Sequence, residues 1–240
     1  MPSSNTWTRQ RILLFMAVLF IIALLPRLVA IERYITPDEL TWVYRSVLFR
    51  EALLQGQWAD TLIAGHPGVT TTWLGALAIT LQLAFQPAAQ DAYTWITQIA
   101  WLAPENAAAF QQLATFLTGA RVAAAVVNSL GLAALFPLLS RLFNRPVAVL
   151  ATLLLALDPF VAGLSGLLHV DGLMTTFATL SLVSLGLVTP AGRWRMALFS
   201  GIMAGLAILS KSPAILFLPL AAFYLFVQLW CPNRKVSGTS

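Results

Sequence analysis

Tyr34-Ile35-Thr36-Pro37-Asp38-Glu39-Leu40 places an acidic pair a few residues after the first long apolar run of the chain. Thr36 before Pro37 predicts a helix start, because threonine is a good N-cap and proline suits the first helical position. From Pro37 to Leu54 the apolar residues recur at helical spacing, which predicts an amphipathic helix. The stretch therefore separates an apolar first segment from a helical loop that begins with two carboxylates.

The composition predicts a polytopic membrane protein. Hydrophobic residues make up 59% of the chain and charged residues 10%, against about 25% charged residues in soluble domains. The net charge of +5 would suit a nucleic-acid binder, but the basic residues occur in pairs beside apolar runs and form no patch with exposed aromatics. We therefore expect a membrane and no nucleic acid as partner. The lone Cys231 excludes an intrachain disulfide and a cysteine metal cluster.

The first transmembrane helix is expected at 12–31, after Arg9 and Arg11. Twenty helical residues span about 30 Å, the thickness of a bilayer core. No Ala-x-Ala-like cleavage site follows, so the segment is interpreted as a retained signal anchor. Arg27, near its far end, is expected to snorkel to the interface.

The number of crossings follows from the distribution of charge. Uncharged runs occur at 67–90, 92–104, 122–140, 146–157, 172–188, 196–210 and 212–230. If 67–104 stays outside and each later run crosses once, all nine acids fall outside or at the outer ends of the helices. These basic residues then fall inside: Arg9, Arg11, Arg141, Arg145, Arg193, Arg195, Arg234 and Lys235. This six-crossing arrangement is preferred, although eight crossings would keep the same charge pattern.

The fold class expected is thus an all-α polytopic bundle of about six transmembrane helices, forming a single membrane domain over 1–240. The outer loop is predicted at 32–119 and five further transmembrane helices at 120–230. A turn at Gly65-His66-Pro67-Gly68 is expected to start a second loop helix, Val69 to Phe85, lying at the interface like the first. The N-terminus is expected in the cytoplasm of a plasma (inner) membrane, with the functional site facing outward.

Polar residues collect at the outer helix ends. An Asp at the centre of a membrane helix costs about 2.5–3.5 kcal/mol, so Asp158 and Asp171 are assigned to a short outer turn around Pro159 to Leu168. The candidate site residues are Asp38, Glu39, His66, His169, Asp171 and Lys211. Each has a structural alternative: the acids as helix caps, the histidines as turn residues, the lysine as a snorkelling side chain.

Five motifs occur in an order that resembles the GT-C glycosyltransferases, and more narrowly the branch with the protein O-mannosyltransferases and the lipid A aminoarabinose transferase. They are Pro37-Asp38-Glu39, His66-Pro67-Gly68, Arg121 at the start of a long run, Leu168-His169-Val170-Asp171-Gly172-Leu173, and the stretch from Gly201 to Ala214 that contains Ser210-Lys211-Ser212-Pro213. The resemblance covers about residues 10 to 230.

The resemblance implies a transferase that uses a polyprenyl-phosphate-linked sugar at the outer membrane face, with a lipid, glycan or protein acceptor. It matches Asp38 to the family's base and Lys211 to a lysine near the donor phosphate, while His169 and Asp171 match a polar loop near the site. Glu39 and His66 are expected among the substrate-binding residues. Family members are usually longer, so the chain is expected to lack their C-terminal part. Asp158 departs from the familiar pattern.

The chemistry is consistent without the family. A phosphate-linked sugar has a good leaving group, so the enzyme needs a carboxylate to deprotonate the acceptor and a cation to neutralise the departing phosphate. Attack opposite the phosphate would invert the anomeric centre. No cofactor is certain; histidines and acids are available for a divalent metal, but no tight ligand spacing demands one.

Two other functions remain open at this stage. A transporter or lipid-binding membrane protein could use the same polar cluster without chemistry, although such a protein would favour inverted repeats and a charge at the bilayer midplane. An inactive fragment of a glycosyltransferase is the other alternative.

Overall fold

The computed structural model describes residues 7–29, 31–33, 35–63, 67–99, 102–103, 105–188 and 194–230. All regular secondary structure within these ranges is helical, which confirms the expectation of a helical membrane protein. His66 lies outside the described residues.

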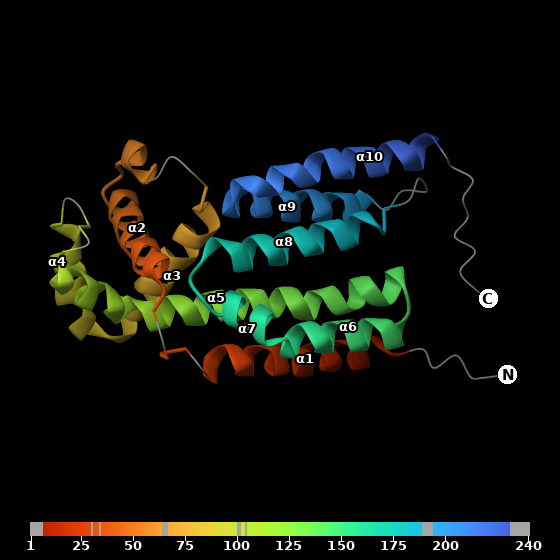
Figure 1. Cartoon of the computed structure of the whole chain (residues 1–240), viewed down its shortest axis with the longest axis horizontal. Coiled ribbons are helices and arrows are strands. Elements are labelled where there is room, and N and C mark those ends of the chain that lie inside the picture. Colours follow the sequence, from red (N-terminus) through yellow and green to blue (C-terminus); the bar gives the residue numbers. More distant parts are fainter. Residues whose placement is uncertain are drawn as a thin grey trace.

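Several helices that follow one another in the chain lie side by side, as α2 and α3, α5 and α6, and α8 and α9 do (Figure 1). Their bounds are α1 Arg9–Val29, α2 Pro37–Leu54, η1 Trp58–Thr61, α3 Val69–Phe85, η2 Pro87–Ala89, α4 Gln90–Thr97, α5 Ala107–Leu142, α6 Arg145–Leu157, α7 Pro159–Ser165, α8 Val170–Leu185, α9 Trp194–Ser210, η3 Ser212–Leu216 and α10 Phe217–Trp230. The two helices expected in the outer loop, from Pro37 and from Val69, are present as α2 and α3.

The long helices lie side by side as a bundle, while α2, α3 and α4 gather at one end of it (Figure 1). Among the described helices, α1 and α5 are long and apolar enough to cross a membrane. α6 and α7 together form a third candidate, broken by a bend of 64°. The helices α3, α8 and α9 and the segment Ser212–Val227 are apolar but shorter. The count of six crossings therefore stays a prediction.

The segment expected as a short outer turn after Asp158 instead forms the seven-residue helix α7. The side chain of Asp158 caps it, because its Oδ1 accepts the backbone N–H of Val161 at 2.8 Å. Pro159 occupies a first-turn position of α7, where its missing N–H costs nothing. Capping thus accounts for the aspartate that departed from the familiar pattern.

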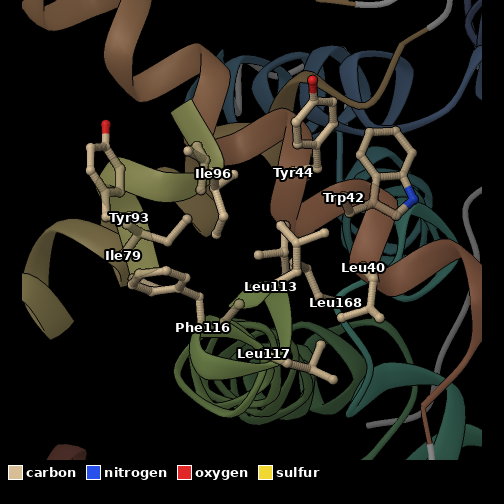
Figure 2. Close-up of a cluster of buried hydrophobic side chains, with 14 of the residues drawn as sticks. Leu40, Trp42, Tyr44, Ile79, Tyr93, Ile96, Leu113, Phe116, Leu117 and Leu168 are labelled. Carbon is tan, nitrogen blue, oxygen red and sulfur yellow. The ribbon is translucent and has the colours of Figure 1, made fainter. Parts of the chain in front are cut away.

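Helix α5 is longer than the apolar run at 122–140 predicted. It begins at Ala107, where the Asn106 side chain accepts the N–H of Ala109 at 3.0 Å, and it continues for 36 residues. Its N-terminal part, 107–119, which was assigned to the loop, contributes to a buried core. Figure 2 shows Leu113, Phe116 and Leu117 of α5 pointing toward side chains of the outer helices.

This cluster, called the outer core below because it lies at the end of the bundle that carries α2, α3 and α4, joins these helices to α5. It contains Leu40, Trp42 and Tyr44 from α2, with further side chains from α3, α4 and the α7–α8 turn. In Figure 2 Ile79, Ile96 and Leu168 lie around the α5 side chains, and the Tyr93 ring meets that of Phe116 edge-on, with ring centres 6.4 Å apart. Each Å² of apolar surface buried in this core contributes about 25 cal/mol of stabilising free energy. This burial holds α2 and α3 on the end of the bundle.

One end of the bundle carries basic residues and none of the described acids. The start of α1, the α5–α6 connection and the start of α9 lie at the end opposite α2 and α3 (Figure 1). These positions carry Arg9, Arg11, Arg141, Arg145 and Arg195. The described acids lie toward the other end, in α2, η1 and α4, in the segments before α2 and α5, and at the starts of α7 and α8.

Arg27 differs from the snorkelling residue expected at the end of α1. Its side chain is buried, only 4% exposed, and its Nε donates to Ser165 Oγ of α7 at 2.9 Å. The bend after α6 brings α7 over the end of α1, and this covers the guanidinium.

Replacing Phe116 by alanine should remove the largest buried side chain that α5 contributes to the outer core. Phe116 is fully buried, so we expect a loss of about 3–5 kcal/mol in the free energy of unfolding, measured by denaturant unfolding in detergent micelles. Phe85→Ala is the matched control, because Phe85 is 81% exposed and its loss should cost at most about 0.5 kcal/mol. Equal effects of the two changes would contradict the packing described.

Candidate functional site

A buried ion pair between Glu39 and Arg121 joins the first turn of α2 to α5. Arg121 Nη2 lies 2.6 Å from Glu39 Oε2, and Arg121 Nε lies 2.7 Å from Glu39 Oε1. Both side chains are almost fully buried. This two-point geometry is the one that guanidinium and carboxylate prefer.

The remaining atoms of the pair are also satisfied. Glu39 Oε2 accepts the backbone N–H of Thr36 at 3.1 Å, and Oε1 accepts the N–H of Leu168 at 3.2 Å. Arg121 Nη1 donates to the carbonyl of Ile31. One carboxylate thus ties together the start of α2, the middle of α5 and the α7–α8 turn.

These contacts decide the ionisation of Glu39. Burial by itself raises the pKa of this carboxyl, but hydrogen bonds and charge from Arg121 and hydrogen bonds from Thr36 outweigh burial. The net pKa of Glu39 is therefore lower than its ordinary value, and the side chain is a stable anion.

Asp38 points the other way. Its side chain is 73% exposed, and its Oδ2 lies 3.4 Å from Nε2 of His169. His169 Nδ1 lies 3.2 Å from Asp171 Oδ2 and accepts the Asp171 backbone N–H at 3.3 Å. The imidazole is thus held between two carboxylates at the start of α8.

Lys211 completes the row of charges. Its Nζ lies 2.5 Å from Asp171 Oδ1, and its side chain is 38% exposed. The end of α9 that carries it is joined to the start of α3 by a hydrogen bond of 2.6 Å between the hydroxyls of Ser210 and Thr70. The row Asp38–His169–Asp171–Lys211 therefore spans three helix ends, with a carboxylate at one end and an ammonium at the other.

A groove lined by aromatic side chains lies along α2, beginning at Trp42, one helical turn after Asp38. It has a volume of about 370 Å³ and is bordered by Trp42, Trp58 and Trp73, with Arg45 among the lining residues. Arg45 lies 4.6 Å from the centre of the Trp42 ring. Burial lowers the pKa of Arg45, while the negative charge of Asp38 opposes this, so the two groups influence each other.

The start of α3 fits against this groove only as glycine. A Cβ on Gly68 would lie 2.1 Å from Cη2 of Trp42, which is far inside contact distance. The backbone before Val69 can therefore lie directly on the indole ring. This close approach packs the start of α3 against Trp42 of α2.

The structure brings together four of the six predicted site residues: Asp38, His169, Asp171 and Lys211. Glu39 belongs to the same turn, but its carboxylate faces the interior. Arg121 was not among the predicted site residues. A single arginine in an otherwise apolar run needs a buried acid, and this rule could have indicated its pairing with Glu39.

The described residues contain no group of three or more His, Cys, Asp or Glu side chains arranged to hold a metal ion.

Comparison with known proteins gives one family match. A family model described as dolichyl-phosphate-mannose-protein mannosyltransferase matches residues 99–237, more than half of the chain. Neither curated proteins nor solved structures give a match. The matched part contains Arg121, His169, Asp171 and Lys211 but not Asp38, so the link to Asp38 rests on its contact with His169.

Replacing Arg121 by methionine should leave Glu39 buried without its counterion and destabilise the protein by about 3–5 kcal/mol. The double variant Arg121→Met/Glu39→Met should lose less than the sum of the two single changes by at least about 1 kcal/mol, because no lone charge remains. Unfolding in detergent micelles gives these energies, with the exposed Arg33→Met as control. Additive effects would show that the pair is uncoupled.

The lowered pKa of Glu39 also predicts a pH dependence. In the unfolded chain the pKa of this carboxyl is about 4.3, so its ionised form stabilises the fold above that pH. The stabilisation is lost as the pH falls through the lower folded-state value. Between about pH 6 and about pH 3, the melting temperature of Glu39→Gln should therefore fall less than that of the wild type. Parallel melting curves across this range would argue against an ionised Glu39.

Proposed function

Because the chain belongs to the dolichyl-phosphate-mannose-protein mannosyltransferase family, a family of GT-C membrane glycosyltransferases, we propose that it transfers a sugar from a polyprenyl-phosphate-linked donor to an acceptor hydroxyl. The observation that carries the proposal is the row from Asp38 to Lys211. It pairs an exposed carboxylate with an ammonium group across one partly exposed histidine.

Asp38 is the proposed base. As the acceptor oxygen attacks the anomeric carbon, its proton passes to the Asp38 carboxylate. The new bond joins the acceptor oxygen to the anomeric carbon, and the bond from that carbon to the phosphate oxygen breaks. The electron pair leaves with the polyprenyl phosphate. Attack from the face opposite the phosphate gives inversion.

Lys211 is the proposed partner of the leaving phosphate. Its ammonium already lies 2.5 Å from Asp171, and this contact holds the ammonium in one position. A phosphate oxygen arriving at the exposed side of Lys211 would share this charge, and the developing negative charge would be neutralised without a rearrangement of the site.

His169 and Glu39 are proposed to hold Asp38 in place. His169 contacts the carboxylate itself, whereas Glu39 fixes the turn from which Asp38 projects. In this proposal Glu39 acts on substrate only through Asp38. His66 stays a proposed substrate contact, because it precedes Pro67 and Gly68 at the start of α3.

The aromatic groove is the proposed approach of the acceptor. Arg45, which interacts with the charge of Asp38, lines the groove, whereas Lys211 does not, so acceptor and donor would reach the carboxylate by different routes. The lipid chain of the donor and the apolar bundle agree with a reaction at the membrane surface. We propose that this surface is the outer one, because the basic helix ends lie at the opposite end of the bundle.

Asp38→Asn should reduce sugar transfer by about 10²–10⁴-fold, because the amide cannot accept the proton of the acceptor. The measurement is transfer of radiolabelled sugar from a panel of polyprenyl-phosphate sugars by the purified protein in lipid. Asp91→Asn, an exposed acid on α4, is the control and should keep wild-type transfer. Undiminished transfer by a folded Asp38→Asn variant would remove Asp38 from the mechanism.

Lys211→Ala should lower transfer by about 10²–10³-fold, and Lys211→Arg should recover part of this loss because it keeps the positive charge. The same assay measures both variants, together with donor binding. Equal activity of the alanine and arginine variants would show that the charge at this position is not used.

A further inference from the structure

A second cavity lies in the bundle, away from the row of charges. It has a volume of about 190 Å³ between α5, α7 and α8, and its walls are mostly apolar, including Leu132, Leu155 and Phe160. Phe160 is 76% exposed, so the cavity opens at the surface of the bundle. Neither Asp38 nor Lys211 lines it.

The buried guanidinium of Arg27 forms part of this apolar wall. Its Nε donates to Ser165 Oγ, which also lines the cavity, and its Nη1 donates to the carbonyl of Ala23. Within the described part of the chain, Nη2 makes no hydrogen bond and no carboxylate lies within 4.0 Å of the guanidinium. Arg27 is therefore a buried cation whose contacts are all neutral.

Neutral contacts compensate only part of this charge. The C-terminus of α1 contributes at most about half a negative charge, and one hydroxyl and one carbonyl satisfy two nitrogens. The effective cost of burying an ion in a protein is still several kcal/mol, and it falls when a counterion is present. Among the described residues, Arg121 has a carboxylate partner in Glu39, whereas Arg27 has none within 4.0 Å.

Two hydroxyls on α8 also line the cavity, one on the exposed Thr175 and one on the half-buried Thr179. Thr175 and Thr179 line the cavity and are four residues apart, so they share one helix face. Neither hydroxyl makes a hydrogen bond within the described ranges. Their neighbours are satisfied, since Thr176 Oγ1 donates to Asn128 Oδ1 at 2.6 Å and Asn128 Nδ2 donates to the carbonyl of Ser165 at 2.9 Å.

We propose that this cavity binds an anionic phospholipid of the bilayer, with its phosphodiester at Arg27 and the Thr175 hydroxyl. A phosphate suits a guanidinium that lacks a counterion, and the apolar walls suit the acyl chain. A free phosphate would leave these walls unfilled. The cavity opens beside the exposed Phe160 at the surface of the apolar bundle, and bilayer phospholipid would contact this surface when the bundle spans a membrane.

The lipid would act on the site through the α7–α8 turn. Ser165 and Gly172 line the cavity, and the segment between them carries Leu168, which donates to Glu39, and His169, which contacts Asp38. A bound headgroup would hold this turn on the side of the cavity, whereas Glu39 holds it through the N–H of Leu168. The lipid is thus a positioning ligand and does not enter the reaction.

The test is a titration of delipidated wild-type protein with phosphatidylglycerol or phosphatidylcholine, followed by thermal unfolding and by native mass spectrometry. Phosphatidylglycerol should raise the melting temperature by about 5 °C and remain bound as one molecule, while phosphatidylcholine should do neither. Arg27→Gln should lose both responses.

Two further variants keep the test decisive if Arg27→Gln does not fold. Leu155→Trp should fill the cavity and lose the response, whereas Leu154→Trp, which lies next to it on α6 but does not line the cavity, should keep it. Thr175→Val/Thr179→Val should weaken the response without filling the cavity. A response that is equal for the two lipids, or unchanged in Leu155→Trp, overturns the proposal. Displacement of phosphatidylglycerol by an equal amount of undecaprenyl phosphate would overturn it as well, because the site would then take the carrier lipid.

Discussion

The buried pair of Glu39 and Arg121 is the interaction on which the arrangement of the site depends. It joins α2, α5 and the α7–α8 turn through one carboxylate whose hydrogen bonds are satisfied on all sides. Successive residues on a helix project about 100° apart, so fixing Glu39 toward the interior turns Asp38 toward the surface. Two adjacent acids thus take different roles: one is a buried structural anion, and the other is an exposed carboxylate beside His169.

The same division applies to the bundle as a whole. Membrane helices supply few polar side chains, so the groups able to do chemistry collect where helices end. Asp38, His169, Asp171 and Lys211 all lie at helix ends on one side of the bundle. The long α5 supports this end, because α2, α3 and α4 pack against its N-terminal part (Figure 2). Arg121 and Arg27 lie deeper, where a charge needs a counterion: Arg121 has Glu39, and for Arg27 a bound lipid is proposed.

The sequence predicted those features that follow from local rules. Thr36 and Pro37 indicated where α2 begins, and the cost of placing charges in lipid indicated that Asp171 and Lys211 lie at one end of the bundle. Pairing across 82 residues, as between Glu39 and Arg121, depends on tertiary packing that no local pattern contains. The helix α7 and the burial of Arg27 beneath it were missed for the same reason, since the bend after Asp158 decides both.

Single-turnover sugar transfer by Glu39→Gln, with donor binding measured on the same sample, tests most directly whether the buried pair positions the base. The account predicts that donor binding stays close to wild type while the rate of the chemical step falls at least about tenfold, because Asp38 loses its fixed orientation. A Glu39→Gln variant that remains folded and transfers sugar at the wild-type single-turnover rate would contradict it.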